Sequence, residues 1–463
     1  MSEPETGRPE PGAARAAVER CLAQIERLDP SLKAMATTTA AGAREQADAC
    51  DRAAAEGRWL GLLHGMPIAL KDNIETAGVR TTSGAAYLAD HIPNSDAPVV
   101  GRLKAQGAVL IGKANMQELA WGVVSTNPVF GQCRNPWNPE RIPGGSSGGS
   151  GAAIAAGMAQ ATLGTDTGGS VRIPASMTGT AGLRPTHGRI SIRGITPVSV
   201  AHDTVGPMAQ SVADVARLFA ALAAYDPLDP VSRDLPLENF LPRLEDGIEG
   251  VRIGLARNFF FEDVAGEVEA AVRAAAGVLE SLGARLVDVT LAGAETAQRW
   301  TTIMAYADAC AYHRERLDAG PGALSEAVYE RMIMGRTFSA VDYAEAMRGR
   351  EAWRRALAGV FESVDVLLSP TTPRPAPPIA DDRSLHRATQ DATRFTYGGA
   401  LASIPGLSVP CGFSSDGLPI GMMLEGAWGA EPLLLRVGHA YQQATEWHLR
   451  RAPCLEEDGA GAT

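Results

Sequence analysis

Short apolar segments alternate with longer segments of helical periodicity along most of this chain. Residues 66–71 and 108–112 are apolar runs of strand length, and residues 99–106 between them have apolar side chains at helical spacing. The same alternation returns in a predicted strand at 251–255 and a predicted helix at 265–282. This pattern is typical of α/β proteins, so we predict a central, mixed, twisted β-sheet covered on both faces by helices.

The chain contains no internal repeat and no long linker that would divide its 463 residues. Residues 1–12 are rich in Pro, Glu and Gly, and we predict a disordered tail there. Residues 13–455 are predicted to form a single domain, and residues 456–463 a second disordered tail. Long helices are expected at 293–318 and 339–362, either as a cap over a pocket or as the surface of a homodimer.

The composition argues against several classes of function. A total of 42 basic and 53 acidic residues gives a net charge of −11, which disfavours binding along phosphate backbones, so we predict no nucleic-acid partner. No run of about 18 apolar residues occurs, so we predict no membrane span. The six cysteines form no metal-binding pattern, and the N-terminal segment lacks the apolar core of a signal peptide. We therefore expect no metal site and a cytoplasmic protein with reduced thiols.

Two glycine–serine segments are the strongest candidates for chemistry. They read GGSSGGSG over 144–151 and GTDTGGS over 164–170. Backbone N–H groups in such segments can bind a phosphate or the oxyanion of an acyl-transfer intermediate. The known phosphate-binding motifs are absent, which favours acyl transfer. A serine nucleophile then needs a base, and the residue pattern leaves this open between His187 and Lys71.

The same region resembles the signature of the amidase family. It reads GGSSGGSGAAIAAGMAQATLGTDTGGSVRIPASMTGTAGLRPT over residues 144–186. The resemblance continues, in family order, in GMPIALKDNI (65–74), FGQCRNPWN (130–138), DTVGPMAQSVADVA (203–216), DVLLSPTTP (365–373), and PGLSVPCGF with GLPIGMMLEG (405–426). It therefore covers most of the chain, and it implies the amidase signature fold.

The resemblance also implies a Ser–Ser–Lys triad that needs no cofactor. The nucleophile falls on Ser170, the bridging serine with a cis peptide bond on Ser146, and the base on Lys71. The oxyanion hole falls on the backbone N–H groups of Thr167, Gly168, Gly169 and Ser170.

The implied triad is consistent with simple physical chemistry. A lysine can accept a proton only when it is neutral, and burial disfavours its charged form. The Ser146 hydroxyl has one donor and two acceptor sites, so it can relay the proton from Ser170 to Lys71. We expect a supporting hydrogen bond from Ser147 and an Asp166–Arg172 ion pair that holds the nucleophile loop.

The substrate is less constrained than the catalytic residues. Residues 115–128 align with a segment that lines the acyl pocket in several members of the family, which places Trp121 and Val124 at the pocket. The sequence therefore predicts an amidase that hydrolyses the C–N bond of small, partly apolar amides through a seryl acyl-enzyme. A small-molecule amide is the expected partner, and aryl amides, esters and carbamates share the chemistry.

Two alternatives remain. The chain also resembles the A subunit of the glutamine-dependent tRNA amidotransferase, which binds its amino-acid substrate through an arginine and an acidic residue. Arg331 and Arg336 lie in the comparable helical region, and Asp416 lies in a C-terminal loop. We interpret both arginines as charges on a helix surface. The second alternative, a catalytically silent scaffold, is disfavoured because all three triad residues are present.

Overall fold

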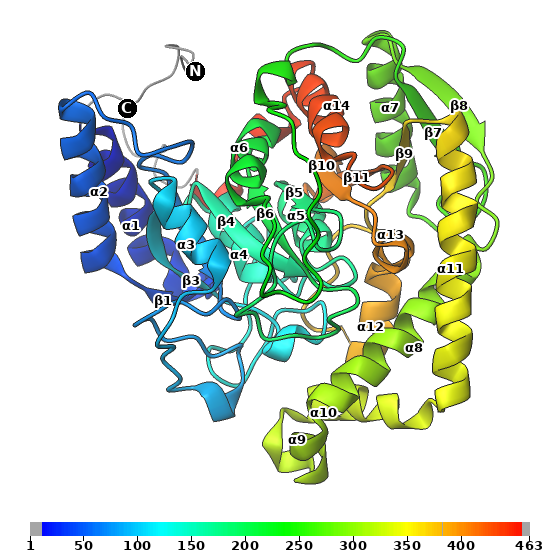
Figure 1. The fold of residues 1–463 in the computed structure, drawn as a ribbon, viewed down its shortest axis with the longest axis horizontal. Coiled ribbons are helices and arrows are strands. Elements are labelled where there is room, and N and C mark those ends of the chain that lie inside the picture. The colour runs from blue at the N-terminus through cyan, green and yellow to red at the C-terminus, as the bar shows by residue number, and fades with distance from the viewer. Residues whose placement is uncertain (1–11, 382, 456–463) are drawn as a thin grey trace.

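Eleven β-strands form one sheet in the computed structural model, which describes residues 12–381 and 383–455 (Figure 1). The order is β1-β3-β2-β4-β6-β5-β10-β11-β9-β7-β8. The strands are β1 (Met35–Thr38), β2 (Pro67–Lys71), β3 (Val109–Ala114), β4 (Ala161–Asp166), β5 (Ala181–Arg184), β6 (Thr204–Ala209), β7 (Arg252–Ala256), β8 (Arg285–Val289), β9 (Val366–Pro370), β10 (Gly406–Phe413) and β11 (Pro419–Glu425). Strand β2 is parallel to β3 and β4, whereas β6 is antiparallel to β4 and β5. The predicted mixed sheet is confirmed.

The described ranges contain fourteen α-helices. They are α1 (Ala13–Leu32), α2 (Ala40–Ala55), α3 (Pro98–Ala105), α4 (Gly148–Ala155), α5 (Arg172–Thr178), α6 (Val212–Leu222), α7 (Gly266–Ser281), α8 (Ala294–Tyr312), α9 (Arg314–Asp318), α10 (Glu326–Ile333), α11 (Ala340–Ser363), α12 (Leu385–Ala392), α13 (Thr396–Ala402) and α14 (Glu431–Gln443). In Figure 1, α9 and α10 lie at one end of α8, away from the sheet. None of the helices in the described part is long and apolar enough to cross a membrane. The predicted tails lie outside the described residues except for Gly12, and the single domain stays a prediction.

The parallel pairing of β2 with β4 determines where the chemistry is placed. Parallel strands end at the same edge of a sheet. The register pairs Leu70 of β2 with Leu163 of β4. Lys71 at the end of β2 therefore lies beside the end of β4, where the glycine–serine segment 164–170 begins.

Strand β6 is an element that the sequence pattern did not predict. Its sequence, TVGPMA, contains a glycine and a proline, and both residues are uncommon inside strands. The pairing of β6 with β5 ends at Met208, which is paired with Gly182. Pro207 therefore lies outside this pairing, and its missing N–H group is tolerated. Pairing with β4 along its whole length then holds the strand in the sheet.

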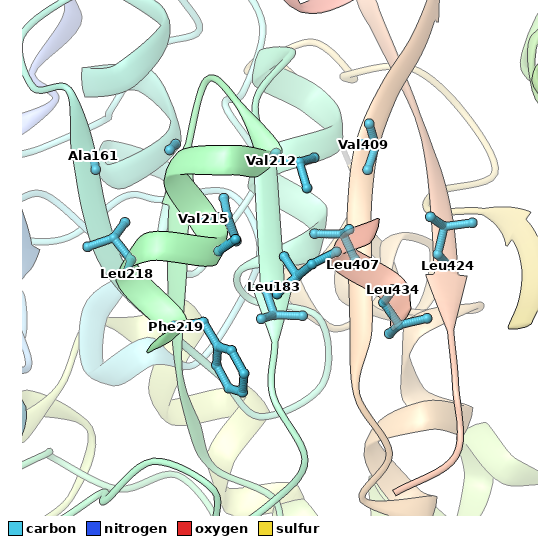
Figure 2. Close-up of a cluster of buried hydrophobic side chains, with 14 of the residues drawn as sticks. Ala161, Leu183, Val212, Val215, Leu218, Phe219, Leu407, Val409, Leu424 and Leu434 are labelled. Carbon is cyan, nitrogen blue, oxygen red and sulfur yellow. The ribbon is translucent and has the colours of Figure 1, made fainter. Parts of the chain in front are cut away.

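The main core lies between the sheet and helices α6 and α14 (Figure 2). Val212, Val215, Leu218 and Phe219 recur at helical spacing, so α6 presents one apolar face. The helix begins at Ser211, whose hydroxyl accepts a hydrogen bond from the N–H of Asp214 at 3.0 Å. This face packs on the centre of the sheet, which stabilises the strands that carry the site.

We predict that Phe219→Ala lowers the free energy of unfolding by about 3–5 kcal/mol, because the side chain is fully buried and its loss leaves a cavity. Urea unfolding followed by circular dichroism measures this. Leu228→Ala is the matched control, since Leu228 is 72% exposed, and we expect little change. Equal effects of the two substitutions would contradict the assigned core.

Candidate active site

The Lys71 amine lies in a fully buried junction between β2 and the glycine–serine segments. Its Nζ is 2.6 Å from Ser146 Oγ and 2.8 Å from Thr165 Oγ1. Burial lowers the pKa of Lys71 to about 7, although the nearby carboxylates of Asp166 and Asp203 act in the opposite direction. A large share of the Lys71 amine is therefore neutral near pH 7. In this neutral form the amine can accept a proton from the Ser146 hydroxyl.

The segment around Ser146 is held by neighbouring hydroxyl groups. The Gly145–Ser146 peptide bond is cis, as the resemblance implied. The Ser147 hydroxyl donates to the Thr165 carbonyl at 3.2 Å, which is the supporting hydrogen bond expected of it. The Ser147 N–H donates to the Ser170 carbonyl at 3.2 Å, so the two serine segments lie side by side.

The Ser170 loop is organised by one buried carboxylate. Asp166 accepts a hydrogen bond from the Gly169 N–H at 2.7 Å and forms ion pairs with Arg172 at 3.1 Å and Arg184 at 3.0 Å. Burial alone would raise the pKa of Asp166, but the two guanidinium groups hold it well below its usual range. The expected Asp166–Arg172 pair is thus present, and Arg184 is an additional member that the sequence did not reveal.

The predicted oxyanion hole needs one correction. The Gly169 N–H already donates to Asp166, so it is not available to an oxyanion. Within residues 12–381 and 383–455, the N–H groups of Thr167, Gly168 and Ser170 have no acceptor. Thr167 and Ser170 are partly exposed, so these three groups are the remaining candidate donors.

Glycine is required at position 168 for lack of space. A Cβ there would lie 2.2 Å from a ring carbon of Tyr397. Gly169 adopts a φ of 127°, which is a conformation that other residues rarely adopt. The loop therefore brings its backbone close to the pocket wall without side chains in between.

A cavity lies directly in front of Ser170. Trp121 lines it, as the aligned segment predicted. Val124 does not: it lines a neighbouring cavity, and Val123 borders both. The other lining residues are Ala120, Gly122, Thr167, Gly168, Val198, Thr301, Ala305, Arg331, Thr389, Thr393 and Tyr397. Two of these residues, Thr301 and Ala305, belong to α8, so this helix covers the pocket.

Arg331 is not the surface charge that we expected. It is 4% exposed, and its guanidinium group lies over the rings of Trp121 at 4.2 Å and Tyr306 at 4.8 Å. Its Nε donates to the Tyr306 hydroxyl at 2.8 Å, while its buried Nη1 has no hydrogen-bond partner among the described residues. By contrast, Arg336 is exposed and pairs with Asp318, and Asp416 is exposed and pairs with Arg141 at 3.5 Å.

His187 is not among the residues that line the cavity in front of Ser170, which disfavours it as a base. It is buried, its Nε2 is 2.8 Å from the Val200 carbonyl, and burial lowers its pKa to about 4. Thr165 was missed by sequence reasoning although its hydroxyl contacts Lys71. In the part of the chain that the structure describes, no cluster of three metal-binding side chains occurs.

The family model "Amidase" matches residues 16–435. The chain belongs to the amidase signature family. A curated relative from Roseiflexus sp. (strain RS-1), named as the A subunit of glutamyl-tRNA(Gln) amidotransferase, is 42% identical over 454 residues, which cover 93% of this chain and 92% of the relative.

Solved structures lead to the same family. The native peptide amidase from Stenotrophomonas maltophilia matches this chain with a TM-score of 0.80 and 31% identity, over 95% of each chain. A structure described as part of a vestigial protein complex that reveals the origins of an s-triazine catabolic enzyme gives a TM-score of 0.88 at 35% identity, over 93% of this chain and 95% of the other.

The predicted set of partners is contradicted by these relatives. We predicted a small-molecule amide as the partner and no nucleic acid. The relatives, however, are named as one subunit of an amidotransferase that acts on a tRNA-linked substrate, glutamyl-tRNA(Gln). Net charge was a poor guide because it reports only on phosphate contacts made by this chain itself. One member of a larger assembly does not need to make those contacts.

We predict that kcat/KM for amide turnover by this protein rises with pH through a midpoint near 7, because Lys71 must lose its proton before it can accept another. Initial rates between pH 5.5 and 9 measure this. Glu425→Gln is the control, since burial raises the pKa of Glu425 to about 7 as well, and we expect this variant to keep the midpoint. A profile that is flat over this range would contradict the role of Lys71.

We predict that Asp166→Asn destabilises the protein by roughly 3–5 kcal/mol and slows catalysis, because Arg184 then lies buried without the carboxylate that pairs with it, and Arg172 keeps only its ion pair with Glu425 at 3.3 Å among the described residues. Thermal unfolding and initial rates measure the two effects. Asp318→Asn removes an exposed ion pair and serves as the control, with an unchanged melting temperature expected. A stable, fully active Asp166→Asn variant would show that the ion pairs do not hold the loop.

Proposed function

We propose that this chain hydrolyses the C–N bond of an amide through an acyl-enzyme on Ser170. The observation that carries the proposal is the buried amine of Lys71, 2.6 Å from the hydroxyl of Ser146 and with its pKa lowered to about 7. A buried neutral amine next to a hydroxyl is the arrangement needed to activate a serine without histidine.

The proposed reaction has two steps. Ser170 Oγ attacks the carbonyl carbon while its proton passes to Ser146, whose own proton moves to Lys71. The N–H groups of Thr167, Gly168 and Ser170 stabilise the oxyanion, and the C–N bond breaks as the amine takes the proton back from Lys71 through Ser146. Water then attacks the acyl group on Ser170 and releases the acid. Esters, carbamates and aryl amides can form the same intermediate.

The cavity also changes the predicted substrate. Its walls are partly apolar, with Trp121, Val123 and Ala305 among them. Arg331, however, lines the same cavity and has an unpartnered Nη1 in the described part of the chain. A guanidinium with a free N–H group binds carboxylates well. We therefore propose that the small, partly apolar amide that the sequence predicted also carries a carboxylate.

The second candidate is a role as the A subunit of a glutamine-dependent tRNA amidotransferase. It is favoured by curated relatives of that name that are 42% identical over nearly the full lengths of both chains. These comparisons support this alternative better than hydrolysis of small, partly apolar amides. Glutamine is an amide whose carboxylate could pair with Arg331, but this role also requires the Ser170 site to accommodate the ammonium group of glutamine.

We predict that a fluorophosphonate, which caps activated serines, labels Ser170 and that Lys71→Met reduces the labelling rate by about a hundredfold or more, the usual loss when a nucleophile's base is removed. Peptide mass spectrometry identifies the site, and Ser170→Ala should abolish both labelling and turnover. Ser150→Ala is the control, because Ser150 is buried nearby with no hydrogen-bond partner among the described residues. Unchanged labelling of Lys71→Met, or an adduct on a different serine, would refute the triad.

A further inference from the structure

We propose that the Ser170 cavity selects amides that carry a carboxylate but no ammonium group. This inference rests on the proposed function and goes beyond it by excluding an ammonium group from the substrate. It separates two kinds of carboxylate-bearing amide, namely monoanions and amino acids such as glutamine, in which an ammonium accompanies the carboxylate.

Among the described residues that line this cavity, Arg331 is a buried cation whose guanidinium group can bind an anion. Arg331 is held between Trp121 and Tyr306, and its Nε is fixed by the Tyr306 hydroxyl. That hydroxyl is in turn 2.8 Å from Nδ1 of His386 on α12. These contacts orient the guanidinium group and leave Nη1 without a partner in the described ranges. A carboxylate of the substrate would supply the missing hydrogen bond and the counter-charge.

The described residues that line this cavity include no carboxylate. Asp203, behind Thr167, already accepts three hydrogen bonds, from the Thr167 hydroxyl at 2.6 Å and from the N–H groups of Val198 and Ser199 at 2.9 and 3.0 Å. Glu118 lies outside the lining and accepts from the N–H of Ser325 at 3.2 Å. Neither of these acidic side chains is free to receive an ammonium group from a bound substrate.

Helix α12 keeps a further acidic residue away from the cavity. Thr389 and Thr393, four residues apart in the sequence, line the cavity in front of Ser170. Asp391 lies on another face, where it lines the neighbouring cavity and pairs with Arg383 at 3.2 Å. The substrate therefore meets hydroxyl groups along this wall, where a carboxylate would be needed to bind an ammonium.

An ammonium group in this cavity would lose its water shell and gain no counter-charge, next to the positive charge of Arg331. A monoanionic amide has neither difficulty. Glutaramate (the monoamide of glutaric acid) differs from L-glutamine only in the absence of the α-ammonium group. Pentanamide has a similar chain length and lacks both charges. The three compounds therefore separate the contribution of each charge.

The experiment compares kcat/KM for the three amides from the rate of ammonia release. Hydrolysis of glutaramate consumes one water and gives glutarate and ammonia. We expect glutaramate to exceed both L-glutamine and pentanamide by about tenfold or more, as a buried charge-assisted hydrogen bond would give. Arg331→Met should reduce the ratio of glutaramate to pentanamide to about one, whereas Arg331→Lys should keep it above one. Fluorophosphonate labelling of Ser170 in each variant checks that the site is folded.

The outcomes separate the inference from the proposed function. L-Glutamine equal to or better than glutaramate, or pentanamide equal to glutaramate, would overturn the inference while amide hydrolysis stands. An unlabelled Ser170 with no turnover of any amide would overturn both. If Ser170 is labelled but no amide is turned over, the deciding measurement is how well each ligand protects Ser170 from the fluorophosphonate. The inference requires glutarate to protect about tenfold better than L-glutamate. Equal protection by the two ligands would overturn it.

Discussion

The burial of the Lys71 amine is the constraint on which the rest of the site depends. The parallel pairing of β2 with β4 places this side chain beside the start of the nucleophile segment. The surrounding strands exclude water, which lowers the pKa of Lys71 to about 7 and makes the amine a usable base. Ser146 and Thr165 then fix its direction through contacts of 2.6 and 2.8 Å. The proposed role of Lys71 as a base thus depends on the topology of the sheet.

A second buried charge, Asp166, shapes the loop that carries Ser170. Its ion pairs with Arg172 and Arg184 balance a carboxylate that would otherwise be costly to bury. It also takes up the N–H of Gly169, which leaves the neighbouring N–H groups for an oxyanion. Arg331 lies outside this network and lines the pocket. The structure therefore separates charges that order the Ser170 loop from a charge that lines the cavity in front of it.

The sequence predicted most of the fold because it depends on local signals, and the resemblance to the amidase signature selected Lys71, Ser146 and Ser170, whose segments lie side by side in the structure. Alternating apolar segments located β2 and α7, and the glycine–serine segments marked the region that contains Ser146 and Ser170. Sequence reasoning failed where a contact between distant segments decides the outcome. Strand β6 carries a proline and is held by its neighbours. Arg331 has the spacing of an ordinary helix-surface residue, and only the packing of α10 against α8 and α12 buries it. The resemblance assigned the Gly169 N–H to the oxyanion hole, but in the structure this N–H donates to Asp166.

The pKa of the Lys71 amine is the measurement that tests this account most directly. The chain has only four lysines, at positions 33, 71, 104 and 113. Side-chain NMR of lysine-labelled protein, with Lys71→Met to assign the signal, can therefore follow this amine through a pH titration. The account predicts a midpoint near 7 for Lys71. A midpoint at or above about 10, the value of a solvated lysine, would contradict it, because the amine would then be charged at neutral pH.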